Sequence, residues 1–225
     1  MEINNYDLFI FDLDDTLIKT EEYHYKIWLE TLQDIIDSNF TFTFNFFCSK
    51  FHSKEKNSIK NYIINDLNLN NYNEILDKKN KLFFEFINKE KNNIKLIDGV
   101  EELINYIIKN NKKFIIVTNS SKNILEFYLE LFPTLKNSTK NYYREMFINR
   151  KPAPDCYLKV INDFSNCKMI GFEDSIAGIH ALQLSNEKIH NIDIIFINNL
   201  DYYHYNYIME NYNIKKNIIN YNNLF

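Results

Sequence analysis

Glycine, proline and cysteine are all scarce in this chain, which has three of each among its 225 residues. The three cysteines, Cys48, Cys156 and Cys167, are odd in number and widely spaced. That pattern fits neither a disulfide framework nor the ligand spacing of a zinc site, so we expect buried or incidental thiols. Because glycine and proline are so few, the ones present mark informative positions, and they are Gly99, Gly171, Gly178, Pro133, Pro152 and Pro154.

The chain also lacks an excess of basic residues and any long apolar run. Its net charge is −4, whereas a nucleic-acid scaffold needs a basic face. No stretch is long enough to span a bilayer, and the first residues show no basic segment followed by an apolar one. We therefore expect a cytoplasmic protein, monomeric or weakly homo-oligomeric, with no nucleic-acid or membrane partner. Its length allows a core domain and a smaller lid.

Short apolar runs alternate with helical patterns over much of the chain. A parallel sheet is expected from this alternation, because strands that alternate with helices are joined by right-handed crossovers. The sequence therefore predicts an α/β fold. The tail from Asp201 has no clear pattern. The predicted strands are residues 7–11, 113–117, 145–148 (weaker), 168–172 and 192–197 (the last), and the predicted helices follow residues 98, 121 and 154.

One long block interrupts the alternation just after the first predicted strand. Its apolar residues recur at helical spacing, first in a helix from Glu22 onward and later around Phe83 and Ile87. The alternation resumes after Ile97, where Asp98 and Glu101 form a pattern typical of a helix N-cap. The sequence thus predicts a core domain of residues 1–18 and 97–225 and an inserted helical domain of residues 19–96.

Polar side chains cluster where the predicted strands end. Asp12, Asp14 and Asp15 follow the first strand, and Thr118 and Asn119 follow the second. Further along, Lys151 precedes a helix, and Glu173 and Asp174 follow a strand, so that a parallel sheet would bring all of these groups to one edge. Taken singly, such residues are ordinary turn and cap residues. Together they match phosphoryl transfer through a carboxylate nucleophile, with a second carboxyl as acid and base, a lysine, and acids for Mg²⁺.

These segments resemble, in order, the four motifs of the haloacid dehalogenase superfamily of aspartate-nucleophile phosphatases. The chain is most similar to the branch of β-phosphoglucomutase and phosphoglycolate phosphatase. The resemblance rests on residues 9–17, 20–28, 118–120, 151–155 and 171–178. It implies a Rossmann-like parallel sheet with an α-helical cap inserted after the first motif.

The resemblance also implies the role of each residue. Asp12 would be the nucleophile and Asp14 the general acid and base, with Lys151 neutralising charge. Phosphate or substrate would be bound by Thr118, Asn119, Lys151, His24 and Lys54. Magnesium would be held by Asp12, Asp14 (through its carbonyl), Glu173 and Asp174.

We expect from these residues a magnesium-dependent phosphatase that acts on a small phosphorylated metabolite through an aspartyl-phosphate intermediate. A sugar-phosphate mutase similar to β-phosphoglucomutase is the alternative among enzymes, and it would return the phosphoryl group to another hydroxyl of the substrate. A protein that binds a phosphorylated ligand without catalysis is the second alternative. The intact set of acids, hydroxyl and lysine favours an enzyme over that last possibility.

Overall fold

A computed structural model describes residues 3–51, 56–189, 192–198 and 205–224. The chain divides into two compact units. One unit contains Met1–Ile18 and Lys95–Phe225, and the other contains Lys19–Ile94. We call them the sheet unit and the helical unit.

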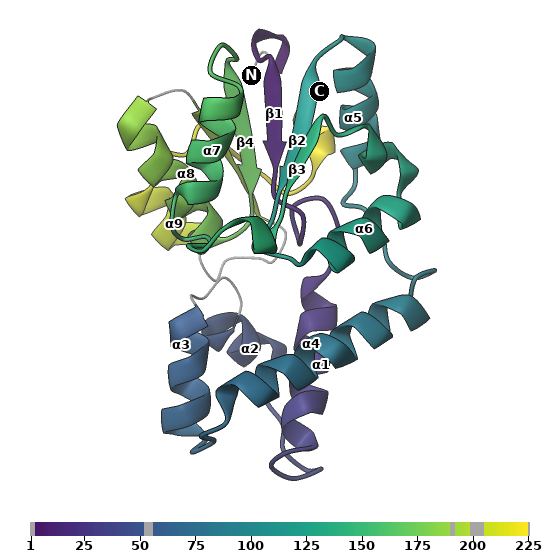
Figure 1. Ribbon diagram of the computed structural model, residues 1–225, viewed down its shortest axis with the longest axis vertical. Helices are drawn as coiled ribbons and strands as arrows, with labels where there is room; N and C mark the ends of the chain where they lie inside the picture. The colour runs from purple at the N-terminus through teal and green to yellow at the C-terminus, as the bar shows by residue number, and fades with distance from the viewer. Residues whose placement is uncertain (1–2, 52–55, 190–191, 199–204, 225) are drawn as a thin grey trace. The chain divides into compact units, whose positions relative to one another are not determined.

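In its described residues, the sheet unit is built on six parallel strands in the order β3-β2-β1-β4-β5-β6, which confirms the α/β prediction. β1 lies between β2 and β4 (Figure 1), so the strand order reverses direction beside it. Ligand sites of open α/β sheets lie at such a switch point, outside the carboxyl ends of the strands. The strands are β1 Leu8–Phe11, β2 Lys113–Val117, β3 Lys140–Tyr142, β4 Met169–Glu173, β5 Ile192–Ile197 and β6 Lys216–Ile218.

The central strands are mostly apolar because both faces of the sheet are covered, and their charged residues, Lys113 and Glu173, stand at strand ends. On one face, α7 (Asp155–Asp163), α8 (Ile176–Ile189) and α9 (Tyr205–Asn211) bury a shared apolar cluster against alternate strand residues. On the other face, the ring of Phe11 stacks on that of Phe172 at 4.7 Å. Successive strand residues point to opposite faces, so each strand contributes to both layers. The remaining helices of this unit are α5 Val100–Lys109 and α6 Lys122–Leu131.

The helical unit has its own core, which is rich in aromatic side chains. Trp28 contacts Phe51 with ring centroids 5.0 Å apart, and Phe51 stacks on Phe47 at 5.5 Å. These rings, with Leu32, Ile63 and Ile75, form one buried cluster. The helices are α1 Glu21–Gln33, α2 Phe44–Lys50, α3 Lys56–Asn61 and α4 Tyr72–Lys89, with a π-helical turn at Tyr62–Asp66. No helix among the described residues is both long and apolar enough to cross a membrane.

The two junctions of the helical unit meet in the sheet unit. Ile18 and Leu96 form an antiparallel bridge, and the N–H of Ile97 donates to the carbonyl of Leu17 at 2.9 Å. The chain therefore leaves the sheet unit and re-enters it at residues that are hydrogen-bonded neighbours.

The prediction that Asp98 is a helix N-cap is wrong. Gly99 occupies that position, with a left-handed φ of 85°, and no side chain caps the helix. The reason is close packing, because a Cβ on Gly99 would lie 2.7 Å from the backbone nitrogen of Asn222. The carbonyl of Asp98 instead accepts from the N–H of Tyr221 at 2.9 Å.

The weaker strand expected at residues 145–148 is also wrong. The strand beside β2 is β3, in which Tyr142 is fully buried, and Arg144–Met146 forms a 3₁₀ turn. Ile148 is 98% exposed and Met146 is 42% exposed, and only Phe147 of this segment packs against the core. Residues 192–197 form a strand as expected, but it is not the last, because α9 and β6 follow it.

The carboxylate of Asp163 joins α7 to the sheet edge. It accepts from Lys140 Nζ at 2.6 Å, from Tyr142 OH at 2.6 Å and from Lys159 Nζ at 2.6 Å. The donors Lys140, Lys159 and Tyr142 hold the pKa of this carboxyl well below its usual range. A carboxyl with a lowered pKa stabilises the fold at neutral pH, and the contribution is lost as pH falls.

We expect Asp163→Asn to lower the melting temperature at pH 7. The difference from the wild type should begin to narrow below about pH 4, near the pKa of an unfolded aspartate, because the unfolded wild-type chain then binds a proton that the folded chain does not bind. Thermal unfolding followed by circular dichroism between pH 3 and 7 measures both quantities. A difference that stays constant over this range would contradict the ion-pair account.

Candidate active site

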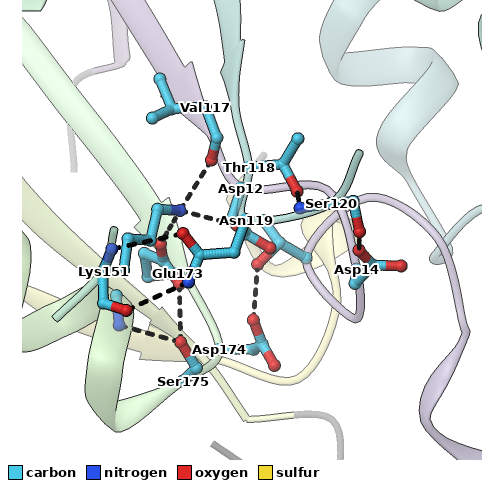
Figure 2. Close-up of polar contacts among 12 residues, drawn as sticks. Asp12, Asp14, Val117, Thr118, Asn119, Ser120, Lys151, Glu173, Asp174 and Ser175 are labelled. Carbon is cyan, nitrogen blue, oxygen red and sulfur yellow. Dashed lines mark hydrogen bonds and ion pairs between the residues drawn. The ribbon is translucent and has the colours of Figure 1, made fainter. Parts of the chain in front are cut away.

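The ammonium group of Lys151 lies at the centre of the site, where it contacts groups at the ends of three different strands. Its Nζ donates to Asp12 Oδ1 at 2.6 Å, to the carbonyl of Val117 at 2.6 Å and to Glu173 Oε1 at 2.5 Å (Figure 2). Its side chain is only 3% exposed. Burial alone would lower the pKa of Lys151, but the charges of Asp12 and Glu173 outweigh burial and raise it above the usual range. The group is therefore a fixed positive charge.

Asn119 fixes the loop that carries Lys151. Its side-chain nitrogen donates to the carbonyl of Lys151 at 3.1 Å, and its side-chain oxygen accepts from the Lys151 N–H at 3.2 Å (Figure 2). The side-chain amide of Asn119 thus has a structural role, and its phosphate contact stays a prediction. The two hydrogen bonds tie the end of β2 to the segment that begins α7.

Asp12 directly follows β1, and its N–H donates to the carbonyl of Phe172 in β4 at 3.1 Å. Burial raises the pKa of Asp12 to about 8, with contributions from the charges of Glu173 and Asp14, although Lys151 opposes the shift. The positive charge of Lys151 therefore does not balance the negative charges of the acids around Asp12.

Glu173 is the last residue of β4 and is completely buried. Besides Lys151, it accepts from Tyr157 OH at 2.6 Å and from Ser175 Oγ at 3.2 Å. Gly178 makes room for this carboxylate, because a Cβ there would lie 2.0 Å from its carboxyl carbon. The first turn of α8 can therefore contact Glu173 only because that position is glycine.

Asp174 points toward the loop that follows β1. Its Oδ1 accepts from Thr16 Oγ1 at 3.0 Å, and the carbonyl of Thr16 accepts from Tyr221 OH at 2.8 Å. Burial raises the pKa of Asp174 well above its usual range, and the charges of Asp12 and Glu173 add to this shift. Among the described residues, this partly buried carboxyl has no ion pair with a lysine or arginine.

Asp14 lies in the loop after β1, where its Oδ2 accepts from Ser120 Oγ at 2.5 Å (Figure 2). Ser120 also donates its N–H to Thr118 Oγ1 at 2.9 Å, which orients the predicted phosphate-binding hydroxyl. Asp15, the next residue, has a left-handed φ of 52°. The loop after β2 therefore holds the side chains of Asp14 and Thr118 in fixed orientations.

The two remaining predicted residues belong to the helical unit. His24 stacks on Phe83 with ring centroids 4.1 Å apart, and its Nδ1 lies 2.9 Å from Lys79 Nζ. With Lys79 as donor, Nδ1 accepts and the proton of a neutral imidazole is on Nε2. Lys54, by contrast, lies outside the described residues.

The acids of the site fit a divalent cation. Within the described parts of the chain, Asp12, Glu173 and Asp174 each offer a carboxylate oxygen, and these oxygens lie within 4.8 Å of one another. Oxygen donors suit Mg²⁺, which also retains water ligands. The raised pKa values of Asp12 and Asp174 agree with this fit, because a cation would stabilise the ionised forms.

Several residues of the site were not among those predicted from the sequence. The Val117 carbonyl carries no sequence signal, whereas Ser120 was part of the polar run after the second strand. Tyr157 could have been noticed as a hydroxyl on the core face of an amphipathic helix. The residues that received no role from the sequence but make contacts in the structure are, in the sheet unit, Thr16, Val117, Ser120, Tyr157, Ser175, Gly178 and Tyr221 and, in the helical unit, Lys79.

The family model of haloacid dehalogenase-like hydrolases matches residues 9–191. The chain belongs to this hydrolase family, as the resemblance of its motifs predicted. A comparison with curated proteins finds no match.

Solved structures of the same fold extend over nearly the whole chain. A family IA, variant 3 hydrolase from Entamoeba histolytica is 22% identical, with a TM-score of 0.79, and the match covers 97% of this chain and 95% of that one. CbbY from Rhodobacter sphaeroides, solved with phosphate, is 17% identical (TM-score 0.72, coverage 97% and 96%). A protein from Thermotoga maritima provisionally named β-phosphoglucomutase is 16% identical (TM-score 0.67, coverage 94% of each chain). These similarities confirm the fold.

We expect Gly178→Ala to destabilise the protein, although alanine normally favours a helix over glycine by about 1 kcal/mol. The added Cβ would overlap the Glu173 carboxylate, and overpacking of this kind costs roughly 1–3 kcal/mol. Urea unfolding measures the change in the free energy of unfolding. A variant more stable than the wild type would show that the carboxylate moves away at little cost.

Proposed function

We propose that this protein is a phosphatase that depends on a divalent cation, expected to be Mg²⁺, and hydrolyses a small phosphorylated metabolite. The observation that carries the proposal is the 2.6 Å contact between Lys151 Nζ and Asp12 Oδ1 beside two further acids. A carboxylate with a lysine at this distance and a cation site next to it is equipped to attack an anionic phosphorus centre. Membership of a hydrolase family supports the same reaction class.

In the proposed first step, Asp12 attacks phosphorus and forms an aspartyl-phosphate while the bond to the substrate oxygen breaks. Asp14, oriented by Ser120, protonates the departing alkoxide. Lys151 neutralises charge on Asp12 and on the transferring group, and the Thr118 hydroxyl contacts a phosphate oxygen.

In the proposed second step, Asp14 accepts a proton from water, whose oxygen bonds to phosphorus as the bond to Asp12 breaks. This returns both carboxyl groups to their starting states and releases inorganic phosphate. The side chains of Asp12 and Asp174, with Glu173 in the same cluster and the Asp14 carbonyl, are the proposed holders of the cation. When bound, the cation would neutralise phosphate charge and orient the group for in-line attack.

The helical unit is the proposed source of substrate selection. It contributes His24, whose orientation is set by Lys79 and Phe83, and Lys54 is the second candidate from this unit. An inserted unit can change its side chains without altering the strands that carry the reacting groups, and such insertions commonly set specificity on a fixed scaffold.

Phosphate release from a panel of phosphorylated metabolites tests the proposal. We expect turnover with Mg²⁺ and its loss on addition of EDTA, because the acidic cluster then lacks its cation. The panel includes β-glucose 1-phosphate, which is also assayed for glucose 6-phosphate. Isomer without free phosphate would replace the phosphatase with a mutase, and no turnover would favour a binding protein.

We expect Asp12→Asn to fold normally and to lose activity by at least about 10⁴-fold, as nucleophile replacements do in enzymes with covalent intermediates. Asp163→Asn is the matched control, because it makes the same change at another lysine-paired carboxylate. Asp163 is the last residue of α7, whereas the segment with Lys151 precedes the first residue of that helix. The control should retain activity. If the Asp12 variant keeps more than a trace of turnover, another group is the nucleophile.

A further inference from the structure

The carboxylate of Glu173 already accepts most of the hydrogen bonds that it can. Its Oε1 accepts from Lys151 Nζ at 2.5 Å and from Tyr157 OH at 2.6 Å, and its Oε2 accepts from Ser175 Oγ at 3.2 Å. An ionised carboxylate offers about four acceptor positions. Glu173 thus uses three of them on the protein itself.

Packing also fixes the position of this carboxylate. It is completely buried, and its atoms lie 2.0–2.1 Å from the point where a Cβ on Gly178 would be. The Ser175 hydroxyl that donates to it also accepts from the N–H of Gly178 at 2.9 Å. The start of α8 therefore leaves the carboxylate little freedom to turn.

The carboxylates of Asp12 and Asp174 accept fewer hydrogen bonds than that of Glu173. Each has one carboxylate oxygen with a hydrogen-bond partner given above, Lys151 for Asp12 and Thr16 for Asp174. The three acids of the cluster thus differ in role. Asp12 and Asp174 are the better cation ligands, and Glu173 is held mainly by donors from the protein.

We propose that Tyr157 is a positioning residue for the phosphoryl-transfer site, because its hydroxyl holds Glu173 in the orientation that keeps the Lys151 ammonium against Asp12. The inference rests on the proposed function and deepens it. Tyr157 is completely buried on α7, and the Lys151 Nζ also lies 5.0 Å from the centre of its ring. Both the hydroxyl and the ring thus confine the lysine.

Tyr157→Phe tests this role because it keeps the ring and removes only the donor. Tyr142→Phe is a closely matched control. Tyr142 is equally buried in the same apolar cluster, and its hydroxyl also donates to a carboxylate at 2.6 Å, that of Asp163. A merely structural hydroxyl would give the two variants the same phenotype.

We expect the free energy of unfolding to fall by a similar amount in both variants. The kcat should fall only in Tyr157→Phe, by roughly tenfold, because that variant loses one charge-assisted hydrogen bond in the site. Its KM should change less than its kcat, and its Mg²⁺ affinity by isothermal titration should match the wild type. Equal activity of the two variants would overturn the proposal. Weaker Mg²⁺ binding, with activity restored at high Mg²⁺, would overturn it too, because Glu173 would then serve the cation.

A readout without turnover separates this proposal from the proposed function. In protein labelled with ¹⁵N-lysine, the Lys151 ammonium signal is identified by its loss in Lys151→Met. We expect that signal to shift or exchange faster with water in Tyr157→Phe and to be unchanged in Tyr142→Phe. An unchanged signal in both variants would refute the positioning role. Absence of phosphate release by the wild type would refute only the proposed function.

Discussion

Burial of the Lys151 ammonium group is the constraint on which the rest of the site depends. A buried charge is costly unless it is paired and hydrogen-bonded, and here each of its three donors has an acceptor. Those acceptors come from the ends of β1, β2 and β4, so the lysine is satisfied only when the three strands are in register. The same contacts place Asp12 among the other acids, so that the architecture of the sheet and the geometry of the site are parts of one arrangement.

Much of the fold could be predicted from the sequence because the central strands are buried on both faces. Continuous apolar runs then mark strands directly, and residues 113–117 and 192–197 match β2 and β5 at both ends. The edge of the sheet was harder to predict, because β3 has three residues and only the last of them is buried. The prediction of an N-cap at Asp98 was wrong because a long-range contact decides the position. Asn222 packs against Gly99, and the local sequence carries no signal for this contact.

The residues that the site brings together were predictable where a polar group follows a strand. Asp12 and Thr118 lie at one edge because β1 and β2 end there, which follows from the fold class, whereas Lys151 lies in the loop between β3 and α7. The supporting contacts were not predictable in the same way. Tyr157 and Gly178 are ordinary residues of amphipathic helices, and only the positions of α7 and α8 on the sheet give them a carboxylate to contact.

The contact between Tyr221 and Thr16 has a consequence for the order of events during protein synthesis. Asp12 and Asp14 leave the ribosome early, whereas Lys151, Glu173 and finally Tyr221 emerge much later. Until then, Asp12 lacks its hydrogen bond with Lys151, and the loop after β1 lacks its hydrogen bond with the Tyr221 hydroxyl. A nascent chain therefore carries its reactive carboxylates in an unassembled form until the segment with Tyr221 has emerged and packed, so the site is not completed strand by strand.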